Sequence, residues 1–184
     1  MFLTGPVEVT THERNHIETH VMSAWFPWYR APEQTLNPPD PRVQGVAINA
    51  PFFCHILMRR SEEQGVSGEI ASTNYEFFET IFQRWCRAND IKINTIYRAC
   101  LNLVTYAPGE HSVPHVDHDW PHNNWIMYLN DLECVSTILF DDDMNPVESI
   151  DARAYTCVAF SQQQHAHQYP RGTDHRFVLV FTWD

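Results

Sequence analysis

The sequence has no run of about 18 consecutive apolar residues, so we expect no membrane-spanning helix. It also has no excess of basic residues, because 12 lysines and arginines stand against 23 aspartates and glutamates, a formal net charge of −11. Such a charge repels a phosphate backbone, so we expect no nucleic acid among its partners. The N-terminal stretch MFLTGPVEVTTHERNH lacks the basic start and apolar run of a secretory signal.

The cysteines are scattered through the sequence and show no CxxC spacing. An odd, dispersed set of cysteines indicates free thiols in a reducing compartment, so we expect a cytoplasmic protein. The five residues are Cys54, Cys86, Cys100, Cys134 and Cys157.

What the chain does contain is enough apolar material for one core. Its 184 residues are 43% hydrophobic and 13% aromatic, and no internal repeat or low-complexity segment divides them. We therefore predict a single domain over residues 1–184. Within it, residues 1–96 are expected to form an N-terminal helical support with a proline- and aromatic-rich arm, and residues 97–184 a catalytic core.

The N-terminal part contains three recognisable segments. Residues 1–10 can begin a strand. Residues 24–41 carry five prolines among aromatic residues, so they predict a loop or arm, and Trp25, Trp28 and Tyr29 are candidates to face a substrate. Apolar residues recur at three- and four-residue steps over 72–90, which predicts an amphipathic helix, with a capping box at Thr73 and Glu76.

From residue 91 onward the pattern changes to short strands separated by turns. The strand-like segments are 91–106, 112–118, 124–130, 136–140, 148–152, 155–160 and 176–183. Many short strands at a spacing of roughly ten residues are typical of a sandwich or barrel. We predict a mostly β (α+β) fold, a double-stranded β-helix or jelly-roll barrel supported by N-terminal helices. The segment RFVLVFTW is apolar on both faces and is expected to be covered on both sides.

The stretch PHVDHDWPHNN, residues 114–124, is unusually rich in histidine and aspartate. On a strand, His115 and Asp117 would point to one face with Cα atoms about 6.6 Å apart. A third metal ligand can come from FSQQQHAHQYPRGTDHR, where either His165 or His167 offers a second imidazole. Two histidines and one carboxylate on one face of a metal leave positions open for other ligands. This arrangement is typical of non-haem Fe(II) oxygenases.

Arg176 begins the last apolar segment and is a candidate to clamp a carboxylate, since a planar guanidinium binds one bidentately. Tyr128, in WIMYLND, can add a hydroxyl donor to the same carboxylate. Aromatic residues that could wall the pocket are Phe140, Phe160, Phe177 and Phe181, although core packing explains them as well.

The stretch from Tyr97 to Trp183 resembles the 2-oxoglutarate-dependent Fe(II) dioxygenases, in particular their prolyl-hydroxylase-like branch. The resemblance covers nearly half of the chain and lies in the strings YAPGEHSVPHVDHDW, WIMYLND, STILFDD, VAF and HAHQYPRGTDHRFVLVFTW. It implies that His115, Asp117 and a distal histidine bind Fe(II), and that Arg176, assisted by Tyr128, pairs with the far carboxylate of 2-oxoglutarate.

The distal ligand follows from the same resemblance. Family members with HAG before a proline and a later arginine use the first residue of that string, which here is His165, whereas members with a shorter separation favour His167. His165 is our choice. The chain departs from the family where Val135 and Ser136 replace a common glycine pair, while Thr137 keeps its position.

The implied reaction consumes O2 and 2-oxoglutarate, releases succinate and CO2, and hydroxylates a C–H bond. The candidate substrates are a prolyl or other residue of a peptide, or a small molecule. The nucleic-acid demethylase branch is disfavoured, because its RxNxxxR string is replaced here by RFVLVFT. The alternative from another class is a non-catalytic, cupin-like metal-binding module, which shares HxD but does not need Arg176.

Overall fold

The computed structural model describes residues 1–32, 40–43 and 45–184. The strands are β1 (Phe2–Pro6), β2 (Tyr29–Ala31), β3 (Ala47–Ile48), β4 (Phe52–Met58), β5 (Ile96–Val104), β6 (His111–Ser112), β7 (Asn123–Tyr128), β8 (Ser136–Phe140), β9 (Pro146–Asp151), β10 (Thr156–Ser161), β11 (His165–His167) and β12 (Arg176–Trp183). The helical elements are α1 (Thr11–His16), a π-helical turn η1 (Ile17–Val21) and α2 (Tyr75–Ala88). No helix of the described residues has the length and apolarity needed to cross a membrane.

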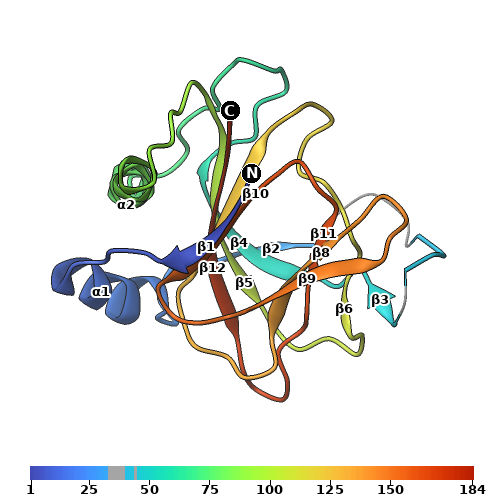
Figure 1. The fold of residues 1–184 in the computed structure, drawn as a ribbon. Coiled ribbons are helices and arrows are strands. Elements are labelled where there is room, and N and C mark those ends of the chain that lie inside the picture. Colours follow the sequence, from blue (N-terminus) through green and yellow to red (C-terminus); the bar gives the residue numbers. More distant parts are fainter. Residues whose placement is uncertain (33–39, 44) are drawn as a thin grey trace.

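Two antiparallel sheets form the body of the molecule. The larger has the order β1-β10-β7-β12-β5-β4-β2 and the smaller the order β11-β8-β9, while β3 and β6 form a short parallel pair. A buried cluster that includes Val158, Val178 and Val180 of the large sheet and Leu139 of β8 joins the two sheets. Figure 1 shows β8, β9 and β11 on one side of the large sheet and the helices on the other. The predicted jelly-roll architecture is confirmed.

The last strand is covered on both faces, as its sequence predicts. Side chains alternate along a strand, so Val178 and Val180 point toward the small sheet, whereas Leu179 and Phe181 point toward the helices. β12 lies between β5 and β7 inside the large sheet. Arg176, at its start, points to the same face as Val178 and Val180, so its charged side chain is buried.

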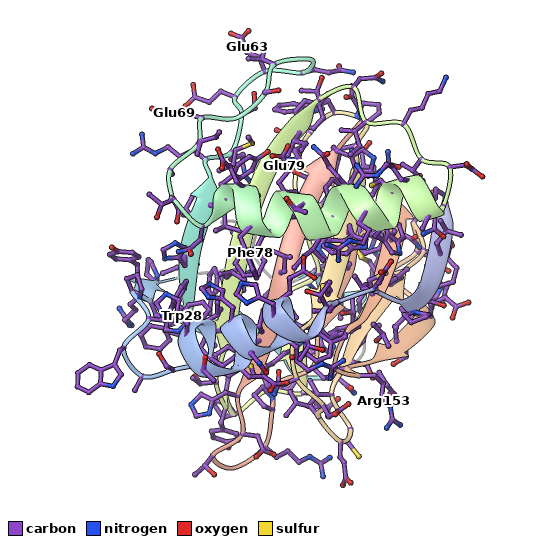
Figure 2. The ribbon with its side chains drawn as sticks, turned by 90° about the vertical axis from the view of Figure 1, so that its left-hand side faces the viewer. Trp28, Glu63, Glu69, Phe78, Glu79 and Arg153 are labelled. Atoms are coloured by element: carbon purple, nitrogen blue, oxygen red, sulfur yellow. The ribbon has the colours of Figure 1, made fainter. Side chains whose placement is uncertain are left out.

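The amphipathic helix α2 supports the outer face of the large sheet, where it lies across the strands (Figure 2). Phe78, Ile81 and Phe82 are fully buried, and the ring of Phe82 stacks on Phe181 with centroids 4.4 Å apart. The predicted helix is confirmed, but its predicted capping box is wrong, because α2 begins after Asn74 and has no side-chain cap.

A complete capping box occurs instead at the start of α1. The hydroxyl of Thr10 accepts a hydrogen bond from the backbone N–H of Glu13, and the carboxylate of Glu13 accepts one from the backbone N–H of Thr10. The same carboxylate forms an ion pair of 2.7 Å with Arg84 of α2. The capping box therefore also ties the two helices together.

The N-terminal half contributes more strands than its sequence predicts. β1 confirms the expected strand within residues 1–10, but β4 was not predicted and pairs with β5 inside the large sheet. β2 lies within the predicted arm, and pairs with β4 at the edge of that sheet. Part of the arm, residues 33–39, lies outside the described residues.

Candidate metal centre and anion pocket

The HxD stretch enters the barrel beside β11. The expected strand over 112–118 is wrong: β6 ends at Ser112, His115 forms only an isolated bridge with His165, and Asp117 lies in a bend. The bridge has two backbone hydrogen bonds of 3.0 Å, from His115 N to the carbonyl of His165 and in the reverse direction. Strand pairing therefore holds the two histidines side by side without a regular strand through Asp117.

The structure brings His115, Asp117 and His165 together. The two imidazole rings have centroids 4.6 Å apart, and Nε2 of His165 lies 3.6 Å from Oδ2 of Asp117. Nδ1 of His115 lies 3.1 Å from the carbonyl of Val113, and Nδ1 of His165 lies 3.2 Å from that of Gln163. A carbonyl only accepts, so Nδ1 carries the proton in both rings and each Nε2 keeps a lone pair for a metal.

Two arginines hold the other oxygen of Asp117. Oδ1 lies 2.9 Å from Nη1 of Arg98 and 3.4 Å from Nη2 of Arg60, and Arg60 also donates to the backbone carbonyl of Asp117. Burial raises the pKa of Asp117, but Arg98, the two histidines and Arg60 outweigh it and hold the pKa below its ordinary value. The carboxylate is therefore ionised, with Oδ2 turned toward His165.

The geometry favours His165 over His167 as the distal ligand. Both lie on β11, but only His165 has a contact of ion-pair length with Asp117. His167 lies 3.4 Å through Nδ1 from the hydroxyl of Ser112, and its ring packs edge-on against Tyr169. Burial, followed by the nearby His115, lowers the pKa of His165 to about 4, so its ring is neutral at pH 7, as a metal ligand requires.

Among residues 1–32, 40–43 and 45–184, no three His, Cys, Asp or Glu side chains already surround one point at metal-binding geometry. The donor set nevertheless suits a non-haem Fe(II), since it offers two imidazole Nε2 atoms and one carboxylate oxygen.

A single cavity connects these three residues with Arg176. The residues that line it are Phe52, Arg98, Asn102, Val104, His115, Asp117, Ile126, Thr137, His165, Ala166, His167, Arg176, Val178 and Val180. Apolar side chains thus separate two polar ends, one with the candidate metal ligands and one with Arg176. A cavity of this kind suits an elongated ligand that has polar groups at both ends.

Arg176 is a buried cation that lacks a counter-ion in the part of the chain that the structure describes. Only 3% of its surface is exposed, Nη2 donates to the hydroxyl of Thr137 at 2.9 Å, and Nε has no hydrogen-bond partner. No ion pair with an acidic side chain of the described residues compensates the charge. Burial lowers the pKa of Arg176, but an arginine stays charged in proteins. Because an unpaired buried charge is costly, this site favours an anionic ligand.

Tyr128 supports this end of the cavity indirectly. Its hydroxyl donates 2.8 Å to Thr137 Oγ1, and its ring lies 5.6 Å below the guanidinium of Arg176. Thr137 itself lines the cavity. Since its oxygen accepts from both Tyr128 and Arg176, its own proton is available to a ligand. Tyr128 thus lies beside Arg176, and Thr137 is the hydroxyl between them that lines the cavity.

Most of the aromatic residues predicted to face the ligand lie elsewhere. Phe177 and Phe181 project to the helix-covered face, so the alternative of core packing holds for both. Trp28 packs on Phe177, with ring centroids 5.8 Å apart, and is therefore also on that outer face. Trp25 is 92% exposed. Phe160 does contact the site, with its ring 5.1 Å from that of His165.

The sequence analysis missed Arg60, Arg98 and Asn102. Arg98 and Asn102 lie on the inner face of β5, in the otherwise apolar segment IYRACLNLV. Polar residues four apart on one face of a buried strand are a signal that could have identified them. Arg60 lies in a loop, where its role depends on tertiary contacts and leaves no local pattern.

No protein-family model matches the chain, and no curated protein sequence matches it. The fold is that of the 2-oxoglutarate–Fe(II) oxygenases. An oxidoreductase of this family from Burkholderia pseudomallei superposes with a TM-score of 0.70 at 12% identity, over 99% of this chain and 84% of the other.

Two further solved structures show how varied the proteins with this fold are. A prolyl hydroxylase from Trichoplax adhaerens, in complex with a peptide fragment of hypoxia inducible factor, has a TM-score of 0.60 at 12% identity and covers 99% and 82% of the two chains. SnoN, an α-ketoglutarate-dependent epimerase of nogalamycin biosynthesis, has a TM-score of 0.55 at 9% identity and covers 100% and 77%. The likeness therefore concerns the fold, and proteins that share it differ in their reactions.

Proposed function

We propose that the chain is a non-haem Fe(II)- and 2-oxoglutarate-dependent dioxygenase that hydroxylates a C–H bond. The observation that carries this proposal is the buried, unpaired guanidinium of Arg176 at one end of a cavity whose other end holds His115, Asp117 and His165. Neither feature is needed for folding, since both concentrate costly polar groups inside an apolar barrel.

In this proposal, Nε2 of His115, Nε2 of His165 and Oδ2 of Asp117 would hold the metal. A bound Fe(II) would supply the activation of O2 that couples conversion of 2-oxoglutarate to succinate and CO2 with oxidation of a substrate C–H bond. Hydrogen bonds to Val113 and Gln163 orient the imidazoles, while Arg98 keeps Asp117 from turning both oxygens to the metal.

The far carboxylate of 2-oxoglutarate would bind Arg176 and accept a hydrogen bond from the hydroxyl of Thr137. The two N–H groups of a guanidinium fork match the two oxygens of a carboxylate, so Arg176 selects a dicarboxylate over a monocarboxylate. Tyr128 holds Thr137 and covers one face of the guanidinium. Val178 and Val180 exclude water between the two polar ends.

The substrate is a peptide or a small molecule. The fold is shared with a prolyl hydroxylase that binds a peptide, whereas the net charge of −11 argues against nucleic acid. The five cysteines are all free thiols in the structure, which suits the reducing cytoplasm that we propose as the location.

A non-catalytic, cupin-like metal-binding module is the alternative. It would use the same HxD ligands, but it gives no reason for Arg176 to be buried without an acidic partner.

Turnover separates the two possibilities. With Fe(II), 2-oxoglutarate and air, we expect succinate release that falls at least tenfold in Arg176→Ala. The control Arg171→Ala removes the same charge from an exposed position a few residues away and should release succinate at the unmodified rate. Absence of succinate from the unmodified protein, or equal rates in both variants, would favour the binding module.

A further inference from the structure

The end of the cavity opposite Arg176 carries a second concentration of positive charge. Arg98 lines the cavity and its side chain is 16% exposed, while the side chain of Arg60 is 49% exposed. Among the described residues, the acidic side chain in ion-pair contact with either arginine is Asp117, which both share. Arg60 and Arg98 are also close enough to repel one another. The single carboxylate of Asp117 therefore forms ion pairs with two arginines.

The register of the large sheet separates this pair from Arg176. In the pairing of β12 with β5, Arg176 is opposite Val104 and Thr182 is opposite Arg98. Six residue steps of strand, roughly 20 Å along the backbone, separate these two levels. The guanidinium of Arg98 is held at Asp117 and that of Arg176 at Thr137, so the two arginines face different groups of a bound ligand.

The loop that carries Arg60 is fastened to the start of β5. Ser61 N donates to the carbonyl of Tyr97, and Gly68 N donates to that of Ile96. A Cβ on Gly68 would lie only 2.0 Å from the carbonyl oxygen of Arg59, so glycine is required for this close approach. Figure 2 shows the loop, with Glu63 and Glu69 labelled, beyond the end of the strands above α2. Arg60 is thus held at the surface end of the site.

A count of charges shows which ligand this arrangement suits. In the loaded site of the proposed function, Arg176 offsets one carboxylate of 2-oxoglutarate. At the opposite end, Fe(II), Arg60 and Arg98 would carry four positive charges against three negative ones, those of the other carboxylate, of Asp117 and of the exposed Asp119, which also acts on Arg60. One positive charge therefore remains uncompensated at this end of the site, in a chain with a net charge of −11. Such a focused positive potential attracts and orients an anionic substrate.

We propose that Arg60 and Arg98 form a subsite for an anionic group, a carboxylate or phosphate monoester, on the molecule that is hydroxylated. The inference rests on the proposed function and narrows its substrate class. Arg60 meets the anion at the surface, and the N–H groups of Arg98 that do not bind Asp117 receive it next to the candidate metal. A neutral prolyl peptide does not use this subsite.

The loop offers a matched pair of variants. Arg59→Gln and Arg60→Gln remove the same charge from adjacent residues, but Arg59 points outward and pairs with Glu69 at 3.0 Å, with 67% of its side chain exposed. Both variants change the net charge of the protein equally. A difference between them therefore reports a local effect of Arg60.

The first experiment uses inorganic phosphate as the probe and Mn(II) in place of Fe(II), with 2-oxoglutarate present. Calorimetry first establishes that the unmodified protein and both variants bind Mn(II) and 2-oxoglutarate. Failure of the unmodified protein to bind them contradicts the proposed function itself, whereas a loss in Arg60→Gln alone would show that Arg60 supports Asp117 and would overturn the inference. Phosphorus NMR then measures how strongly bound Mn(II) broadens the phosphate signal. We expect saturable broadening in the unmodified protein and Arg59→Gln, and a phosphate Kd at least fivefold weaker in Arg60→Gln. Equal phosphate affinity in the two variants, or no saturable broadening, would overturn the inference.

The second experiment identifies the anion. Succinate release with Fe(II) and air is measured for a panel of small carboxylates and phosphate monoesters, each beside its neutral amide or alcohol, and for a neutral prolyl peptide. We expect stimulation by anionic members, lost in Arg60→Gln and kept in Arg59→Gln. Stimulation by neutral members to the same extent, unaffected by Arg60→Gln, would contradict the inference while leaving the proposed function intact.

Discussion

Nη1 of Arg98 lies 2.9 Å from Oδ1 of Asp117, on the side of the carboxylate away from His165. Arg98, a residue of β5 in the large sheet, thus determines which oxygen of Asp117 faces the imidazoles. Hydrogen bonds to metal ligands fix their orientation, and their loss typically reduces metal affinity by about 10- to 100-fold.

We therefore expect Arg98→Ala to weaken Mn(II) binding, measured by calorimetry, by about tenfold or more. Arg98→Gln should lose less Mn(II) affinity than Arg98→Ala. The glutamine amide can still donate to Oδ1 of Asp117, and because it is uncharged it does not repel the metal. Asn102→Ala, a change on the same face of β5 without contact to Asp117, is the control. Equal losses in the glutamine and alanine variants would show that the hydrogen bond does not orient the carboxylate.

His165 and His167 offer a direct test of the distal ligand. His165→Ala should abolish measurable Mn(II) binding, since it removes one of three proposed ligands. His167→Ala should retain the metal, because His167 contacts Ser112 and has no ion-pair contact with Asp117. The reverse result would assign the distal ligand to His167 and would require the strand β11 to shift.

Thr137 links Arg176 and Tyr128 through its hydroxyl. Thr137→Val keeps the shape but removes this group, so the affinity for 2-oxoglutarate in the Mn(II) form should fall about tenfold, equivalent to about 1.4 kcal/mol. Ser136→Ala is the neighbouring control, because its hydroxyl binds Asp151 instead. An unchanged affinity in Thr137→Val would remove Thr137 from the proposed carboxylate site.

The capping box of α1 predicts a pH-dependent contribution to stability. The hydrogen bond from Arg84 lowers the pKa of Glu13 from 4.5 to about 2, although burial opposes the shift. A depressed pKa means that the stabilisation is complete above about pH 5 and disappears as the pH falls toward 2. Chemical unfolding at pH 7 should show Glu13→Ala destabilised by about 2 kcal/mol, with the difference from the unmodified protein vanishing near pH 2.

The control for this prediction is Glu76→Ala, which occupies the capping position that the sequence wrongly suggested for α2. Glu76 is exposed, and α2 has no side-chain cap, so the free energy of unfolding should change by less than about 0.5 kcal/mol. A larger loss from Glu76→Ala than from Glu13→Ala would mean that the helix start is described incorrectly.

The sequence predicted the barrel and brought the candidate site residues to attention because their signals are local. The continuous apolar run in RFVLVFTW indicates a strand covered on both faces, and HxD places two candidate ligands within three residues. The pairing of Arg176 with a carboxylate came from the resemblance to a known family and stays a prediction.

What the sequence did not predict depends on long-range contacts. Arg60 and Arg98 meet at Asp117 only after β5 and the preceding loop have been assembled. The inward or outward direction of Phe177 depends on the register of β12, since a shift of one residue reverses every side chain. The capping box predicted at Thr73 and Glu76 was wrong because Thr73 and Asn74 are both residue types that begin helices, and their spacing alone does not choose between them.

The most direct test of the central claim is an anaerobic titration of the protein with Fe(II) and 2-oxoglutarate, followed by visible absorption. The account predicts a metal-to-ligand charge-transfer band that saturates at one Fe(II) and one 2-oxoglutarate per chain. The band should be lost in His115→Ala, weakened in Arg176→Ala and unchanged in Arg171→Ala. A folded protein that shows no such band, or whose band does not depend on His115 and Arg176, would contradict the assignment of this cavity.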